Sequence, residues 1–276
     1  MNYRHSFHAG NFADIVKHAL VLWLLDRRQA DGPVAVVDTH AGAGLYDLTG
    51  DAVRSREAEA GVARLMASED RPPLSEALAA EVARLNPDGG VRLYPGSPLL
   101  MAGRLRPGDR YTGFEMNPPV LALLEEALAA FPSAGARGGD GYDQAPAAAA
   151  QASGALVLID PPFERPDDYR RAADTAAALV RADPRATVAV WTPLKDLETF
   201  DGFLRRLDQA GARRALVAEA RLRPLTNPMK MNGCALVVLN PPAGAEAAAR
   251  EVCGWVAARL GEAGARAEVW TTGETA

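Results

Sequence analysis

The chain has 276 residues, of which 48% are hydrophobic and 24% are charged. This length suits one large domain with an insertion and is short for two full domains, and the composition argues against wholesale disorder. The formal net charge of −5 is not the basic balance that favours nucleic-acid binding, so any phosphate contacts would have to come from local clusters of basic residues.

The chain shows no sign of a targeting or membrane segment. The amino-terminal stretch Met1–His5 lacks the apolar core of a signal peptide, and the longest aliphatic run, Ala19–Leu25, is far too short to span a bilayer. The two cysteines, Cys234 and Cys253, have no metal-binding spacing and fit a reducing compartment. We therefore expect a cytoplasmic protein that does not enter the membrane.

Alternating helical and strand patterns predict the fold. The first helix is predicted over Asn11–Arg28, with Asn11 as its N-cap. Strands are predicted at Val34–Asp38, Tyr111–Glu115, Ala155–Asp160, Thr187–Thr192, Ala215–Leu222, Ala235–Asn240 and Ala267–Thr271. Further helices are predicted at Val120–Phe131, Asp168–Arg181, Leu197–Ala210 and Ala245–Leu260. This order predicts an α/β fold with a seven-stranded, mostly parallel, doubly wound sheet.

One segment interrupts the alternation. Helical patterns at Glu57–Ser68 and Ser75–Leu85 lie between the first two predicted strands. We expect residues 46–94 to form a small helical insertion subdomain, and residues 1–45 and 95–276 to form the main domain. The insertion could be a stabilising cap, or a lid that recognises substrate.

The stretch Leu156–Phe163 carries the most chemical information. Four apolar residues predict a buried parallel strand, which delivers Asp160-Pro161-Pro162-Phe163 to the sheet edge where α/β proteins bind ligands. The two prolines lack N–H groups and fix the backbone, so the carbonyls of Asp160 and Pro161 are available as acceptors. A planar base with an exocyclic amine could donate to these acceptors while it stacks on Phe163. The similar stretch Val237–Pro242 has no aromatic ring and is interpreted as a structural strand end.

Three more motifs occur in the order expected of an S-adenosylmethionine site. Asp38–Gly44 is similar to the acidic, glycine-rich first motif of enzymes that use this cofactor, with Asp38 near the methionine end. Glu115 ends the next predicted strand and is a candidate for the ribose hydroxyls. Asp140, within Gly138–Tyr142, is a candidate acceptor for the adenine amine of the cofactor. The inserted helices explain the long gap between the first motif and Glu115.

All four histidines fall within the first forty residues: His5, His8, His18 and His40. His5 and His8 have a spacing that metal sites use, but no cysteine or carboxylate cluster completes a ligand set, so no metal is expected. His18, on the first helix, and His40, on the glycine-rich turn, are better placed to surround the carboxylate of a cofactor.

Taken together, these motifs resemble those of the bacterial RlmJ family. The resemblance covers nearly the whole chain and rests on Tyr3–Asn11, Lys17-His18, Asp38–Gly44, Tyr94–Pro98 and Asp160–Phe163. It implies a Rossmann-like, S-adenosylmethionine-dependent methyltransferase that modifies N6 of an adenine in 23S rRNA, adenine 2030. It also implies that the partner is this RNA. We expect the RNA to be protein-free or at an early stage of assembly, and the protein to be a monomer.

The resemblance also implies roles for individual residues. Contacts to S-adenosylmethionine are expected from Lys17, His18, Asp38, His40, Gly42, Ser97, Glu115, Asp140, Gly141 and Asp160. Asp160, Pro161 and Phe163 would be catalytic, and Tyr3, His5 and Phe163 would meet the RNA. The chain departs from the family at Phe163, where tyrosine is usual, and at Phe12, where histidine is frequent.

The expected chemistry follows from the weak nucleophilicity of the adenine amine. Hydrogen bonds from this amine to Asp160 and to the Pro161 carbonyl would free the nitrogen lone pair for in-line attack on the sulfonium methyl group. The base must leave its stack, which favours unpaired RNA. Two other functions share these motifs: a DNA adenine-N6 methyltransferase, and a non-catalytic S-adenosylmethionine-binding module on ribosomal partners.

Overall fold

The computed structural model describes residues 8–49 and 56–273. In this part of the chain, one sheet contains eight strands: β1 (Ala35–Asp38), β4 (Arg110–Glu115), β5 (Ala134–Gly138), β6 (Leu156–Ile159), β7 (Thr187–Leu194), β8 (Ala215–Arg221), β9 (Gly233–Leu239) and β10 (Arg266–Thr271). Their order across the sheet is β5-β4-β1-β6-β7-β9-β8-β10. The pairs from β5 to β7 are parallel, and β9 and β10 run antiparallel to their neighbours. The α/β fold with a mostly parallel sheet is therefore confirmed.

The predicted number of strands in this sheet was wrong by one. All seven predicted strands are present, and the additional one is β5. Its sequence, Ala-Gly-Ala-Arg-Gly, has no β-branched or aromatic residue and therefore carries no strand signal. β5 lies at the sheet edge and pairs only with β4, so backbone hydrogen bonds to one neighbour hold it in place.

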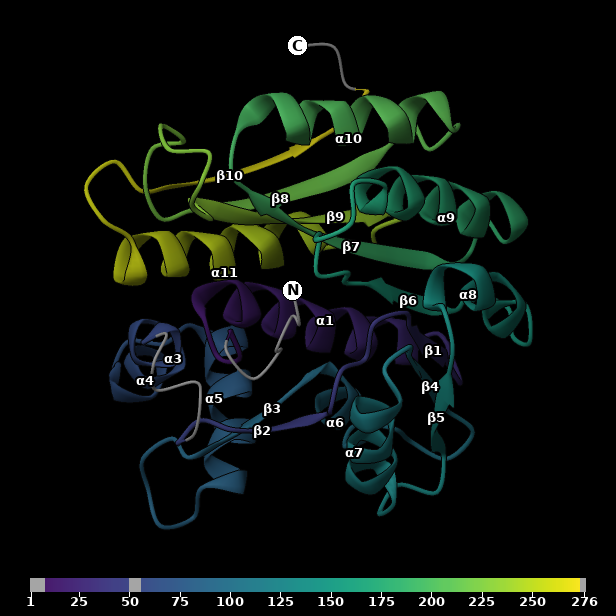
Figure 1. The fold of residues 1–276 in the computed structure, drawn as a ribbon, viewed down its shortest axis with the longest axis horizontal. Helices are drawn as coiled ribbons and strands as arrows, with labels where there is room; N and C mark the ends of the chain where they lie inside the picture. Colours follow the sequence, from purple (N-terminus) through teal and green to yellow (C-terminus); the bar gives the residue numbers. More distant parts are fainter. Residues whose placement is uncertain (1–7, 50–55, 274–276) are drawn as a thin grey trace.

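Helices cover both faces of the sheet. The main ones are α1 (Phe12–Gln29), α6 (Ser97–Ala102), α7 (Pro118–Leu128), α8 (Gly141–Ala149), α9 (Asp168–Ala182), α10 (Leu197–Gln209) and α11 (Ala245–Leu260). Figure 1 shows α8, α9 and α10 on one face and α1 and α11 on the other. Asn11 is the N-cap of α1, as predicted, because its side chain accepts hydrogen bonds from the backbone N–H groups of Ala13 and Asp14. Among the described helices, none is both long and apolar enough to cross a membrane.

Strand β6 lies at the centre of this three-layer arrangement. Leu156 and Leu158 pack into the core shared with α1 and α11, while Val157 and Ile159 pack into the core shared with α8, α9 and α10. Each of the four side chains is at most 1% exposed. Burial on both faces is why this strand is a continuous apolar run rather than an alternating one.

The described part of the segment between β2 (Leu45–Asp47) and β3 (Leu93–Pro95) contains helices, and these two strands pair with each other. It holds α3 (Glu57–Ala60), α4 (Val62–Ala67) and α5 (Pro73–Leu85). The prediction of a single helix over residues 57–68 is wrong, because the helix is interrupted at Gly61. There the Gly10 carbonyl approaches so closely that a Cβ would lie 2.2 Å from its oxygen.

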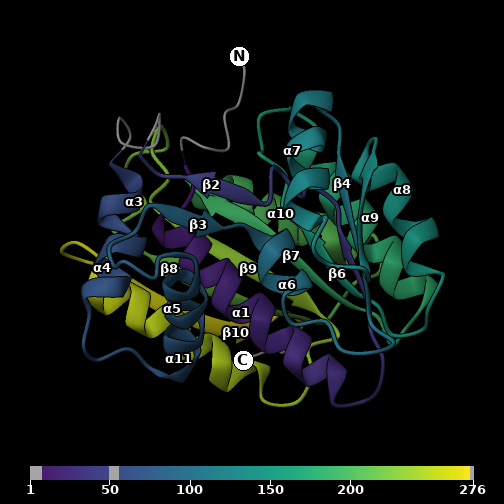
Figure 2. The ribbon, with the colours of Figure 1, turned by 90° about the horizontal axis from the view of Figure 1, so that it is seen from below.

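The inserted helices pack against the main layer, as Figure 2 shows from below. Leu65 and Leu78 belong to the same buried core as α1 and α11, and the backbone N–H of Leu74 donates to Glu251 of α11 at 2.9 Å. The division of the chain into a main domain and a subdomain at residues 46–94 stays a prediction.

The end of β9, which was interpreted as a structural strand end, lies away from the Asp160 loop. Since β9 runs antiparallel to β7, Asn240 lies beside the start of β7, at the edge of the sheet opposite to the Asp160 loop. The Thr187 hydroxyl donates to the Asn240 carbonyl at 3.1 Å, and the Asn240 side chain donates to the carbonyl of Ala186 at 2.9 Å.

Candidate functional site

The carboxyl ends of the parallel strands bring three predicted acidic residues to one edge of the sheet. Asp38 ends β1, Glu115 ends β4 and Asp160 follows β6 directly. β1 lies between β4 and β6 in the sheet. After β1 the chain forms β4 on one side of β1, and it later forms β6 on the other side. Ligands of doubly wound sheets bind at this kind of switch in strand order.

Glycines allow close packing at the turn after β1. Gly42 has a φ of +66°, a left-handed conformation that disfavours other residues. Gly141 opens α8, and a Cβ there would lie 1.9 Å from the Thr39 carbonyl oxygen. The turn and the start of α8 therefore pack together at this edge of the sheet.

A large cavity of about 720 Å³ lies at this edge. Among the predicted site residues, it is lined by His40, Gly42, Glu115, Asp140 and Gly141. Apolar side chains also line it, namely Leu45, Met116, Val120, Leu123 and Pro162. The volume lies in the range of small-molecule sites, and an apolar wall with a few acceptors suits a nucleoside. The residues present therefore fit the adenosine part of S-adenosylmethionine.

Asp38 is fully buried beneath this edge and does not line the large cavity. Its carboxylate accepts hydrogen bonds from the hydroxyl groups of Ser97, at 2.7 Å, and Tyr111, at 3.1 Å. Burial raises the pKa of Asp38 to about 6, and the negative charge of Asp160 adds to this effect, although the two hydrogen bonds favour the ionised form. Asp38 thus fixes the Ser97 side chain at the start of α6.

The catalytic candidate Asp160 is paired with Lys17. The Lys17 Nζ atom lies 2.6 Å from Asp160 Oδ2 and 2.8 Å from Asp14 Oδ1, and all three side chains are largely buried. Burial alone would lower the pKa of Lys17, but the two carboxylates raise it well above its ordinary value. Burial would raise the pKa of Asp14, yet Lys17 and His18 lower it to about 2. The cluster holds one ammonium between two carboxylates.

This cluster lines a second, small cavity of about 50 Å³ next to the large one. His40 and Tyr46 line both cavities. Predicted site residues on its wall are Lys17, His18, His40, Ser97, Asp160 and Pro161. The His18 Nδ1 atom lies 2.8 Å from the Tyr94 hydroxyl, and the His40 Nδ1 atom lies 2.7 Å from the Thr39 hydroxyl. The acidic and basic groups near Asp160 are therefore next to the pocket that suits a nucleoside.

Phe163 ends the Asp-Pro-Pro-Phe loop in an uncommon backbone conformation. Its φ is +51°, which costs a bulky L-residue about 1–3 kcal/mol and is found mostly where surrounding contacts impose it. Its ring centroid lies 4.4 Å from that of Tyr169 and 6.0 Å from that of Trp191. The loop thus places an aromatic group beside Trp191, which also lines the small cavity.

Two predicted RNA contacts, Tyr3 and His5, lie outside the described residues. His8 is described, and its Nδ1 atom lies 2.9 Å from Glu57 Oε1, so it contacts the inserted helices. Within residues 8–49 and 56–273, no three histidine, cysteine or acidic side chains gather as a metal site would require.

Sequence reasoning missed three residues around the site. Asp14 lies three residues before Lys17 on α1, and this helical spacing could have indicated the ion pair. Trp191 follows Val190, which pairs with Ile159, so the register of β6 and β7 places it near the motif loop. Arg171 donates to Asp140 at 2.7 Å, a contact between helices that no sequence pattern indicates.

Comparison with known proteins identifies the family of this chain. A family model described as "Ribosomal RNA large subunit methyltransferase D, RlmJ" matches residues 31–272. The Ribosomal RNA large subunit methyltransferase J of Escherichia coli (strain K12) is 33% identical over 96% of this chain and 95% of its own length. The chain belongs to this family. The protein of the same name from Haemophilus influenzae is 30% identical over 91% of both chains.

A solved structure supports the fold. A protein from Legionella pneumophila, 24% identical in sequence, superposes with a TM-score of 0.89 over 97% of this chain and 99% of its own. A similarity at this level of identity speaks to the fold alone. The fold is therefore shared along almost the full length of both chains.

Proposed function

We propose that the chain transfers a methyl group from S-adenosylmethionine to N6 of an adenine in 23S rRNA. Membership of the family supports a ribosomal RNA methyltransferase. The choice of an adenine amine rests on one observation: the Asp160-Pro161-Pro162-Phe163 loop ends β6 between the nucleoside-sized cavity and the Lys17 cluster. The target position, adenine 2030, comes from the family resemblance.

The methyl donor would lie across the two cavities. Glu115 and Asp140 line the large cavity and offer acceptors for ribose hydroxyls and for the adenine amine. His18, His40 and Ser97 line the small cavity and offer polar contacts to the methionine end. When bound there, S-adenosylmethionine supplies an electrophilic sulfonium methyl group. The turn after β1, which contains Gly42, and the start of α8 at Gly141 bring backbone atoms close to this space.

Asp160 and Pro161 would hold the target amine. Pro161 cannot donate, and in the described part of the chain its carbonyl accepts no loop or turn hydrogen bond, so it remains an acceptor. The Asp160 carboxylate offers a second acceptor that is buried and held in place by Lys17. Two acceptors on one amine localise the nitrogen lone pair and orient it. After methyl transfer, the surplus proton on N6 passes to an Asp160 carboxylate oxygen or to water.

Lys17 holds the Asp160 carboxylate in place before the base arrives. Its ammonium group donates to Asp160 Oδ2 at 2.6 Å, a short charge-assisted hydrogen bond. An entering amine competes with Lys17 for Asp160, and Asp14 keeps the ammonium in place during that exchange because it lies 2.8 Å away on the same helix. Lys17 and Asp14 thus prepare the acceptor without taking part in bond making.

The geometry also bears on the state of the RNA. An adenine can reach a buried carboxylate only after it leaves its stack, at a cost of about a few kcal/mol in a duplex and less in a loop. We therefore propose that the substrate is unpaired rRNA. We further propose, from the sequence rather than from this geometry, that the RNA is protein-free or early in assembly and that the enzyme acts on it as a monomer in the cytoplasm. Phe163 would stack on the extruded base.

One transfer assay separates the candidate functions. The protein is incubated with radiolabelled S-adenosylmethionine and, in turn, protein-free 23S rRNA, assembled large subunits and duplex DNA. We expect incorporation into protein-free rRNA, and none with Asp160→Ala, although this variant still binds the donor. Incorporation into DNA alone would support a DNA adenine methyltransferase. Donor binding without incorporation into any nucleic acid would support a non-catalytic module.

A further inference from the structure

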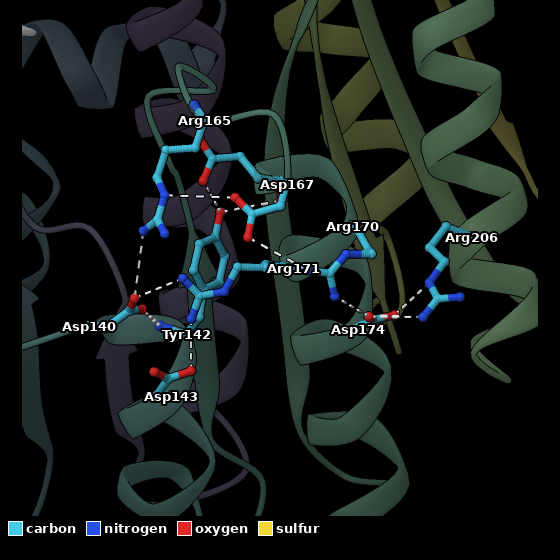
Figure 3. Close-up of polar contacts among 10 residues, drawn as sticks. Asp140, Tyr142, Asp143, Arg165, Asp167, Arg170, Arg171, Asp174 and Arg206 are labelled. Carbon is cyan, nitrogen blue, oxygen red and sulfur yellow. Dashed lines mark hydrogen bonds and ion pairs between the residues drawn. The ribbon is translucent and has the colours of Figure 1, made fainter. Parts of the chain in front are cut away.

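The first turn of α8 is clamped by one side chain of α9. Arg171 donates from Nη1 to Asp140 Oδ2 and from Nη2 to Asp143 Oδ1, both at 2.7 Å. Its guanidinium carbon also lies 4.5 Å from the centroid of the Tyr142 ring. Figure 3 shows these three groups converging on Arg171. The planar fork of arginine suits this arrangement, which a lysine could satisfy only in part.

The clamp fixes the orientation of the Asp140 carboxylate. Oδ1 accepts the Tyr142 N–H at 3.0 Å and caps α8, and Oδ2 accepts from Arg171. A carboxylate has about four lone-pair sites, so both oxygens can still accept another hydrogen bond. Asp140 lines the large cavity. Partial burial raises the pKa of Asp140, but the hydrogen bond and the charge of Arg171 keep that pKa below its ordinary value. An ionised acceptor therefore faces the nucleoside-sized space.

We propose that Arg171 is a positioning residue that makes the site selective for a purine with an exocyclic amine, because it holds Asp140 as an oriented acceptor. This inference rests on the proposed use of S-adenosylmethionine. A 6-amino group donates to Asp140. A 6-oxo group has no hydrogen to donate and presents its own oxygen to the carboxylate, and sites built to pair with an N–H group discriminate strongly against such analogues.

The neighbouring ion pairs identify Arg171 as the residue that controls Asp140. Arg165 lies 3.9 Å from Asp140 and 3.7 Å from Asp167, but its side chain is 53% exposed, compared with 15% for Arg171. An exposed, longer contact contributes little orientation. Asp174 of α9 pairs with Arg206 of α10 at 2.7 and 2.9 Å, and neither residue lines the large cavity.

The Arg206–Asp174 pair supplies a matched control for the test. Both Arg171 and Arg206 make short bonds from guanidinium to aspartate at the helices that cover one face of the sheet (Figure 3). Asp140, the partner of Arg171, lines the large cavity, whereas Asp174, the partner of Arg206, does not. Arg206→Gln therefore removes a guanidinium–aspartate contact of the same length, from a side chain that is 44% exposed, without touching the acceptor for the nucleoside.

Calorimetric titration with S-adenosylhomocysteine and S-inosylhomocysteine tests the inference without any transfer reaction. We expect the wild type to prefer the adenosyl ligand at least tenfold, and Arg171→Gln to lose most of this preference through weaker adenosyl binding. Arg171→Lys should restore part of the adenosyl preference, and the control Arg206→Gln should keep it. In an Asp140→Asn background, adding Arg171→Gln should change the preference no further, because the acceptor that Arg171 orients is already lost. Thermal unfolding of each variant checks its fold.

The outcomes separate this inference from the proposed function. Equal weakening of both ligands by Arg171→Gln would show a merely structural clamp and overturn the inference, as would an unchanged preference. If Arg171→Gln does not fold, Arg171→Lys decides, because a preference equal to that of the wild type would also overturn it. A wild-type protein that binds neither ligand would contradict the proposed function itself, and the inference with it.

Discussion

Replacing Lys17 with methionine should destabilise the fold by leaving two buried carboxylates without their cation. Lys17 lies 2.6 Å from Asp160 and 2.8 Å from Asp14, and the side chains of Asp160 and Asp14 are 8% and 17% exposed. Removing one partner of a buried ion pair costs about 3–5 kcal/mol, because the charge left behind has lost both water and its partner. Methionine has a similar volume, so the change in packing adds little.

The Asp14 pKa, which Lys17 and His18 lower together against the effect of burial, indicates the scale of part of this loss. A carboxyl whose pKa falls from 3.8 to about 2 on folding contributes about 2 kcal/mol to the free energy of unfolding. Because its pKa is lowered in the folded state, this contribution is present above about pH 4 and disappears as the pH falls toward 2. The remainder of the expected loss comes from Asp160.

Urea unfolding followed by tryptophan fluorescence measures the effect. We expect Lys17→Met to lower the free energy of unfolding by about 3 kcal/mol at pH 7.5 and by less at pH 5, where the Asp14 carboxyl, buried without its cation, begins to take up a proton. In an Asp14→Asn background, the same replacement should cost at least about 1 kcal/mol less, since one of the two charges is gone. A loss below about 1 kcal/mol, or one that does not change with pH, would refute this account of the cluster.

Three further predictions concern the motif residues. Because burial raises the pKa of Asp38 to about 6, the contribution of Asp38 to the free energy of unfolding falls as the pH rises through 6. In urea titrations, the stability of the wild type relative to Asp38→Asn should therefore drop by about 1 kcal/mol between pH 5 and 7.5. A constant difference would contradict this. Phe163→Ala should lower kcat/KM for rRNA roughly 5- to 150-fold through lost stacking, whereas Phe163→Tyr should not, and S-adenosylhomocysteine affinity should hold in both. Gly141→Ala brings a Cβ to 1.9 Å from the Thr39 carbonyl oxygen and should lower the free energy of unfolding by about 1–3 kcal/mol. Gly135→Ala meets no atom within 4 Å and should change the free energy of unfolding by no more than about 0.5 kcal/mol. Similar melting temperatures for the two variants would count against the close approach.

Patterns within single elements predicted most of the fold. The apolar run at Leu156–Ile159 and the Asn11 cap of α1 were identified correctly, because local periodicity and capping chemistry determine them. β5 could not be predicted, since its residues have low strand propensity and only pairing with β4 makes it a strand. The break at Gly61 was missed for a related reason, because the carbonyl that requires a glycine there belongs to residue 10.

The candidate site was predictable where a residue lies at a strand end. Glu115 and Asp160 were identified in this way, and the structure places them at one edge of the sheet. Contacts between side chains from distant elements were not predictable. The pairing of Lys17 with Asp160 joins residues 143 apart in sequence, and the bond from Arg171 to Asp140 depends on how α9 packs on α8. Such contacts are set by tertiary packing, which no spacing in the chain reports.

The most direct measurement is the identity of the methylated nucleoside. Protein-free 23S rRNA treated with the enzyme and S-adenosylmethionine is digested to nucleosides and analysed by mass spectrometry, with Asp160→Asn as the comparison. The proposed mechanism predicts N6-methyladenosine from the wild type and a loss of at least about 100-fold in its rate of formation with Asp160→Asn, whose amide is a poorer acceptor and cannot take up the surplus proton. A methyl group on a ribose or on another base, or an undiminished rate with Asp160→Asn, would contradict it.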